Sequence, residues 1–109
     1  MAYDQGLAAL LRDDLDGRPG ISEQEMFGGL AFMLFGNMLC GVTSQGAMFR
    51  VGKDRQAEAM EIPGTGPMEF TGKPMGGMVS ASDETMADEE ARGTLLALAL
   101  AHAEDLRAK

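Results

Sequence analysis

A chain of 109 residues, 45% of them hydrophobic and 24% charged, has the composition of one globular domain, residues 1–109, and not of a disordered segment. Its formal net charge of −8 disfavours direct nucleic-acid binding, because affinity for phosphate backbones comes mainly from Lys and Arg. No apolar run approaches the roughly 20 residues of a membrane-spanning helix, so no membrane association is expected.

Cysteine and histidine each occur once, as Cys40 and His102, which leaves no internal disulfide and no zinc site built from thiolates and imidazoles. We predict no metal and no cofactor. Cys40 stands between apolar neighbours in a predicted strand and is interpreted as a small buried hydrophobe. His102 shares an apolar helical stripe and is interpreted as a half-buried packing residue. A single thiol and an opening segment without basic residues favour the cytoplasm.

The first predicted element is a helix over residues 2–16, because four leucines recur at the spacing of one helical face: Leu7, Leu10, Leu11 and Leu15. Asp13, Asp14 and Asp16 are interpreted as its solvated end. Glycine and proline at residues 17–20 stop the helix. Weak alternation from Ile21 then predicts an edge strand that ends before a glycine turn.

Two short apolar runs, residues 30–35 and 38–43, predict an antiparallel hairpin. Gly36 and Asn37 separate the runs, as a two-residue link of the type that matches the twist of a hairpin. Residues 47–51 follow as the next strand, so a meander of three or four strands is expected.

The next part of the chain predicts a short helix at residues 53–60, from its propensity. Residues 62–67 are predicted to be a loop, because they contain two prolines and two glycines. Residues 68–70 and 77–81 are candidate strands on either side of a turn at residues 72–74.

One long final helix is predicted, capped by Ser82 or Asp83 and rich in acidic residues in its first turns. Leu96 and Leu100 widen its apolar stripe enough to cover a sheet or to meet a partner helix. A weak homodimer is therefore expected, with either a sheet edge or the stripe from Leu96 to Leu100 as its seam.

Two glycine-punctuated motifs are the candidate interaction sites: Met26, Phe27, Gly28 and Gly29 in the first, and Gly72, Lys73, Pro74 and Met75 in the second. Glycine pairs amid large apolar residues mark specified backbone geometry, and a substitution at Gly28 or Gly29 is costly if either has a positive φ. Lys73 is not followed by the Ser or Thr of a P-loop, so a turn is the better interpretation of the second motif. No catalytic residue is identified.

Methionine is unusually frequent, with ten in the chain. Its flexible thioether fills irregular gaps in cores and also makes adaptable binding surfaces, so the excess fits either use. A pliable core is favoured, whereas Met75 and Met78, beside turn residues, are left open between the two.

The order of these signals resembles the N-terminal domain of the TfoX/Sxy competence-regulator family. The resemblance is carried by the two glycine motifs, the hairpin between them and the segment Met48, Phe49, Arg50 and Val51, and it covers about residues 3–105. It implies a two-layer α+β domain, secretion-chaperone-like, with helices packed on one face of an antiparallel sheet in the order α-β(3)-α-β(2)-α. It implies a bacterial cytoplasmic protein and no reaction. Met78 stands where the family commonly has an aromatic residue.

Two functional hypotheses follow. The first is a non-catalytic regulatory module that binds an unknown protein partner, and it is preferred because no catalytic set is visible. The alternative is a small enzyme or an anion- or ligand-binding protein with a site near Gly28, Gly29, Lys73, Pro74 and Met75, where backbone amides and a lone cation would hold the ligand. A cleft uniting Lys73 with other cations would favour the alternative.

Overall fold

The computed structural model describes residues 5–26, 29–43, 46–70 and 73–107, with the backbone alone at 26, 67–70, 73–76 and 107. The elements follow in the order α1 (Gln5–Asp14), β1 (Ile21–Met26), β2 (Gly29–Leu34), β3 (Asn37–Thr43), β4 (Gly46–Arg50), α2 (Lys53–Ala59), β5 (Thr65–Phe70), β6 (Lys73–Ala81), α3 (Asp83–Ala87) and α4 (Glu89–Arg107). Four strands lie between α1 and α2, one more than the resemblance implied, because the edge strand β1 pairs along all of β2.

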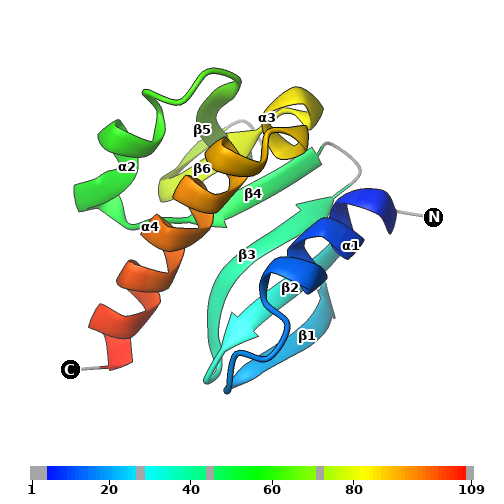
Figure 1. Cartoon of the computed structure of the whole chain (residues 1–109). Coiled ribbons are helices and arrows are strands. Elements are labelled where there is room, and N and C mark those ends of the chain that lie inside the picture. The colour runs from blue at the N-terminus through cyan, green and yellow to red at the C-terminus, as the bar shows by residue number, and fades with distance from the viewer. Residues whose placement is uncertain (1–4, 27–28, 44–45, 71–72, 108–109) are drawn as a thin grey trace.

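The strands form one sheet in the order β1-β2-β3-β4-β6-β5, and every neighbouring pair is antiparallel. The helices pack on one face of this sheet, with α1 and α4 both in front of β3 in Figure 1. The predicted two-layer α+β fold with helices on one face is therefore confirmed. The long apolar face of α4 explains the arrangement, because packing against the sheet removes this face from water.

The hydrophobic core lies between the helices and the sheet. Leu30, Phe32 and Leu34 alternate along β2 and point into it, and the strand register continues this row from Phe32 to Cys40 and Phe49. Cys40 is fully buried, as predicted. The helices contribute the opposite side of the core, chiefly Leu7, Leu11, Leu95, Leu96, Ala99 and Ala103.

The β2–β3 hairpin turns one residue earlier than predicted, at Phe35 and Gly36 instead of Gly36 and Asn37. Both turn residues have positive φ, 49° and 87°, as a type I′ turn requires. Phe35 is held in this unusual conformation by a tertiary contact, because its amide donates to the Gly20 carbonyl at 2.8 Å. That contact lies outside the local pattern of the hairpin, which explains the error.

The prediction of a loop at residues 62–67 is wrong at its end, because β5 begins at Thr65 and includes Pro67. An edge strand tolerates proline, since one side of its backbone has no neighbour to accept an amide hydrogen, and the β5–β6 register shifts between Pro67 and Glu69. The predicted turn at residues 72–74 is also too long. Lys73 and Pro74 are strand residues of β6, paired with Phe70 and Glu69.

The predicted single final helix is two helices. Ser82 caps α3, since its hydroxyl oxygen accepts the Thr85 amide at 3.2 Å, which confirms one of the two predicted caps. The chain then leaves helical geometry at Asp88, whose carboxylate accepts the amides of Glu90 and Ala91 and so caps α4. No helix in the described part of the chain has the length and hydropathy needed to cross a membrane.

A partly buried ion pair joins the two ends of the chain. The Arg92 guanidinium donates to both Asp14 carboxylate oxygens, at 2.6 and 3.4 Å, and to the Met86 carbonyl at 2.7 Å. The Arg92 side chain is only 9% exposed and that of Asp14 is 26% exposed. The prediction of a solvated helix end is therefore wrong for Asp14, which pairs with Arg92 and so ties α1 to the start of α4 and to the end of α3.

We expect Asp14→Ala to lower the free energy of unfolding by roughly 2 to 3 kcal/mol, because it leaves the Arg92 charge desolvated and unpaired. Glu23→Ala is the matched control. It removes the carboxylate that pairs with Arg12 on the surface, where the two side chains are 36% and 51% exposed, and it should cost less than about 1 kcal/mol. Urea denaturation of both variants measures the difference, and equal losses would contradict a structural role for the Arg92 pair.

Candidate functional site

The first glycine motif lies at the turn between β1 and β2. Met26 is the last residue of β1 and pairs with Gly29, the first of β2, while Phe27 and Gly28 lie outside the described residues. Gly29 does not have a positive φ. It is needed for another reason, because a Cβ there would collide with the Val42 carbonyl oxygen of the neighbouring strand.

The second motif lies at the other end of the sheet. Lys73, Pro74 and Met75 open β6, and Gly72 lies outside the described residues. The register runs from Leu30 through Val42 and Ala47 to Ala81, so the first motif is level with the last residue of β6 and the second with its beginning. The strands β3 and β4 also separate the two hairpins. The sheet therefore does not bring the described residues of the two motifs together into one pocket.

A close backbone contact positions α2 against the sheet. The Gly77 carbonyl in β6 accepts the amides of Val51 and Gly52 at 2.9 and 3.0 Å. The Gln56 side chain of α2 completes the contact, because its oxygen accepts the Gly77 amide and its nitrogen donates to the Met78 carbonyl, both at 3.2 Å. Gly52 and Gly77 both have positive φ, 87° and 83°, and a Cβ on Gly77 would lie 3.2 Å from the Gly52 backbone. We call this arrangement the Gly52–Gly77 junction.

His102 of α4 lies over this junction, since a Cβ on Gly52 would meet its imidazole Nδ1 at 2.5 Å. The side chain is half-buried, as predicted. Burial lowers the pKa of His102, and the nearby guanidiniums of Arg50 and Arg55 lower it further, against smaller opposing effects of Asp54 and Asp105. An imidazole among cations is a poor proton acceptor, so the arrangement favours the packing role.

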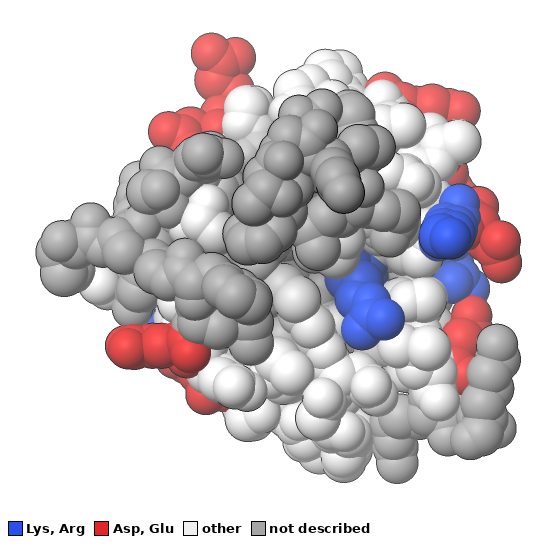
Figure 2. All heavy atoms as spheres, turned by 180° about the vertical axis from the view of Figure 1, so that it is seen from behind, with Lys and Arg blue, Asp and Glu red and all other residues white. Residues whose placement is uncertain are grey.

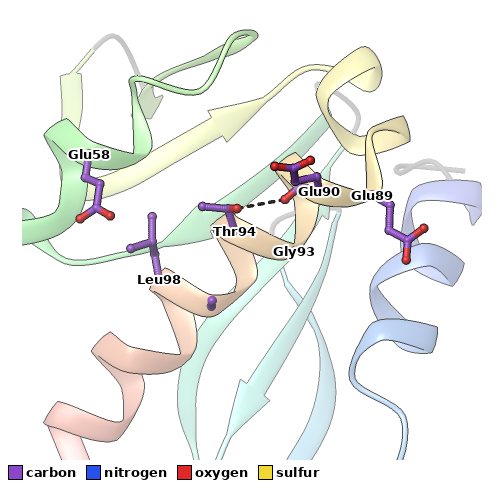
Figure 3. A pocket seen from close by; sticks show the side chains of 7 residues that line it. Glu58, Glu89, Glu90, Gly93, Thr94 and Leu98 are labelled. Carbon is purple, nitrogen blue, oxygen red and sulfur yellow. Dashed lines mark hydrogen bonds between the residues drawn. The ribbon is translucent and has the colours of Figure 1, made fainter.

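An open groove runs between α2 and α4 on the helical side of the molecule (Figure 3). Glu58 of α2 forms one side, and α4 contributes the rest of the lining through Glu89, Glu90, Gly93, Thr94, Ala97 and Leu98. Figure 3 shows Glu58 and Leu98 directed toward one another, whereas the side chain of Glu89 is directed toward α1. The Thr94 hydroxyl donates to the Glu90 backbone carbonyl at 3.0 Å, and Glu90 is exposed. We call this the α2–α4 groove.

The face of the sheet opposite the helices is the second open surface. Ala31 and Gly41 lie at its centre, paired with one another, and both are buried without belonging to the core between helices and sheet. Half-buried methionines surround them: Met33, Met38 and Met48. Their register places Met33 beside Met38 and Met48 beside Gly41. Figure 2 shows this side from behind, with a white expanse below the grey residues and most acidic atoms at the outline. We call these five residues the open sheet face.

Reactive groups are poorly placed for chemistry in the described part of the chain. Burial raises the pKa of the Cys40 thiol far above its usual range, and the Asp14 carboxylate adds to the rise, so the thiolate nucleophile is suppressed. No group of three or more metal-binding side chains gathers among the described residues.

Sequence patterns missed the α2–α4 groove, because its two sides meet only in the folded chain. One local signal was present: Gly93 and Ala97 are small and fall outside the buried face of α4. Small residues on an exposed helical face leave room for a neighbour, but they do not identify Glu58 as the opposite side.

The family model of the TfoX N-terminal domain matches residues 13–103 of the chain. Comparisons with curated proteins and with solved structures find no match.

The Gly52–Gly77 junction predicts an unequal effect of alanine at two glycines with nearly the same φ. Gly36→Ala should cost about 1 kcal/mol, because a Cβ there meets nothing within 4 Å and only the left-handed conformation is penalised. Gly77→Ala should cost about 2 to 3 kcal/mol, since its Cβ also presses on the Gly52 backbone. Denaturant unfolding measures both, and equal losses would show that the junction is not tightly packed.

The chain has one histidine, so its titration is resolved without assignment. We expect the NMR titration of His102 to give a pKa below its ordinary value of 6.5. Stability should then fall as the pH drops from 6.5 toward that lowered value, because the unfolded chain binds the proton first. His102→Gln should remove this part of the pH dependence. A pKa at or above the ordinary value would contradict the packing of the imidazole beside Arg50 and Arg55.

Proposed function

Since the chain belongs to the TfoX N-terminal domain family, we propose that it is a non-catalytic regulatory module that acts by binding another protein. By the same resemblance we propose a bacterial, cytoplasmic, competence-regulator-like role. The observation that carries the proposal is the open sheet face, where half-buried methionines lie on the side of the sheet that the described helices leave uncovered.

The composition of the open sheet face supports protein binding. Ala31 and Gly41 make its centre flat, and the Met48 methyl group reaches over Gly41, where a Cβ would lie 3.1 Å from it. Unbranched methionine side chains adapt to the shape of a partner and bury apolar area on binding. The three methionines are half-buried and so give this face partly exposed apolar area, and exposed apolar area commonly marks an interaction site. The methionine excess thus serves the surface here, while Met78 and Met86 are buried.

The charge of the chain supports a protein partner over a nucleic acid. A net charge of −8 repels phosphate backbones, and the described ion pairs occupy Arg12, Arg55 and Arg92 with carboxylates of the same chain. The burial of the Cys40 thiol and the cationic surroundings of His102 support a role without covalent or proton-transfer chemistry.

Weak self-association stays a prediction. Of the two proposed seams, the stripe on α4 is largely used within the molecule, because Leu96 is 6% exposed and Leu100 is packed against the core. A sheet edge is therefore the more accessible seam.

We expect Met48→Glu to lower the recovery of specific partners by about tenfold or more, because an unpaired carboxylate in an apolar contact costs at least about 1.4 kcal/mol. The measurement is quantitative affinity purification from the native cell followed by mass spectrometry. Met60→Glu is the matched control, because it makes the same substitution at a methionine outside the open sheet face. Met60 is 39% exposed and lies at the end of α2.

Thermal melting of both variants checks that the fold is retained. The proposal is supported if some proteins are recovered with the wild type and with Met60→Glu but are lost from the purification with Met48→Glu. If Met48→Glu retains every partner of the wild type, the open sheet face is not the binding surface.

A further inference from the structure

We propose that the α2–α4 groove binds one amphipathic helix of a partner protein, with its apolar side on α4 and its Lys or Arg side chains beside Glu58 and Glu90. The inference rests on the interaction role proposed above, and it adds the chemistry of one partner at a surface separate from the open sheet face.

The floor of the groove fits a helix. Gly93 and Ala97 of the floor are spaced four residues apart on α4, so they lie one above another along one side of the helix, and Ala101, four residues further on, continues the row beyond the groove. A Cβ at Gly93 would meet nothing within 4 Å, and Ala97 is exposed, which leaves open space along this row. Small side chains let a second helix approach closely, because the distance between packed helices depends on the side chains at the contact. Leu98 adds apolar area beside the row.

The sides of the groove determine the charge of the helix that fits. No described ion pair or side-chain hydrogen bond engages the carboxylates of Glu58 or Glu90, whereas the neighbouring Arg55 is paired with Asp105 at 2.8 Å. The two carboxylates stand on different helices, Glu58 on α2 and Glu90 in the first turn of α4 (Figure 3). Lys or Arg residues flanking the apolar stripe of a bound helix would reach both, and electrostatic complementarity would fix its orientation.

A partner protein fits better than the two other classes of occupant. Nucleic acid is repelled by the same carboxylates. A second copy of this chain carries the same net charge of −8, which opposes close approach to an acidic groove. A basic helix from another protein removes the repulsion and covers the apolar floor at the same time.

The short length of the groove limits the affinity. The row from Gly93 to Ala101 rises about 12 Å along α4, or roughly two helical turns. A contact of this size is at the low end of specific interfaces, so dissociation constants of roughly micromolar or weaker are expected. The attraction should weaken as salt is raised, because the charges lie at the solvent boundary.

The test uses a designed peptide as a probe and the whole chain as the receptor. The probe is a fluorescein-labelled peptide of about 18 residues, or five helical turns, with Leu and Ala on one face and Lys on both flanks. Two control peptides have the same composition in scrambled order, and the same pattern with Glu in place of Lys. Fluorescence anisotropy measures binding, and NMR shifts of the backbone amides locate it.

Three variants of the chain separate the groove from the general acidity of the protein. Glu58→Lys and Glu90→Lys each reverse a charge that faces the groove. Glu89→Lys is the matched control, because Glu89 also lines the groove and neighbours Glu90 in the first turn of α4, but its side chain is directed toward α1 (Figure 3). Thermal melting confirms that all three are folded.

We expect the amphipathic basic peptide to bind with shifts centred on Gly93, Thr94 and Ala97. Glu58→Lys and Glu90→Lys should each raise the dissociation constant of the peptide about fivefold to tenfold, a range usual for one close charge pair. Glu89→Lys should change the dissociation constant less than about twofold, which in free energy is about a third of the effect of either groove variant. Retained binding by the chain with Met48→Glu would show that the groove acts independently of the open sheet face.

The inference is overturned by any of four results. These are the absence of binding, equal binding of the scrambled peptide, an equal loss of binding with Glu89→Lys, and NMR shifts centred on the open sheet face.

Sedimentation of the chain alone tests whether a second copy of the chain occupies the groove. A dimer that Glu90→Lys changes, while Glu89→Lys does not, would assign the groove to a second copy and reject the basic partner helix. The proposed interaction role is tested separately by Met48→Glu, so the two can fail independently.

Discussion

The position of α2 depends on one backbone contact, in which Gly52, the N-cap of α2, meets Gly77 within β6. The amides of Val51 and Gly52 converge on the Gly77 carbonyl, and the Gln56 side chain bonds the Gly77 amide and the Met78 carbonyl, so the start of α2 is hydrogen-bonded to β6. A Cβ on Gly77 would lie 3.2 Å from the Gly52 backbone, and both glycines have the positive φ that glycine tolerates. Because α2 is fixed in this way, one side of the α2–α4 groove is fixed with it.

The other side of the groove is α4, which is held near both of its ends. Near its start, Arg92 pairs with Asp14 and bonds the Met86 carbonyl, so α1 and α3 are joined to it. Toward its end, His102 lies over Gly52 and Asp105 pairs with Arg55 of α2. Between these points the buried side of α4 covers the sheet, and its opposite side lines the groove. A surface held at two points is already shaped before a partner arrives, which lowers the entropy cost of binding.

Much of the fold could be predicted from the sequence, because its signals are local. The apolar runs of β2 and β3 and the short α2 are visible in stretches of fewer than ten residues, and Ser82 is a residue type that commonly begins a helix.

The features that the sequence did not predict depend on residues distant in the chain. Asp14 and Arg92 are 78 residues apart, so the pattern around Asp14 shows only an acidic helix end. Phe35 adopts its turn conformation because its amide bonds the Gly20 carbonyl, and the break at Asp88 interrupts a stretch whose residues on both sides favour a helix.

The candidate site was the feature that the sequence predicted least well. Both glycine motifs mark specified backbone, but the sheet places them at opposite ends, whereas the groove arises from Glu58 and α4, which no local pattern connects.

Hydrogen exchange at the Gly77 amide tests the central claim most directly, namely that the Gln56 side chain and the Gly52–Gly77 junction fix α2 on the sheet. In the wild-type chain this amide should exchange as slowly as the amides of the central strands, because it is bonded to Gln56 and buried beside Gly52. In Gln56→Ala its exchange should accelerate by about tenfold or more while Phe49 and Val79 in the sheet stay protected, since only a local opening is made easier. Rapid exchange of Gly77 in the wild type, or an unchanged rate in Gln56→Ala, would contradict the account.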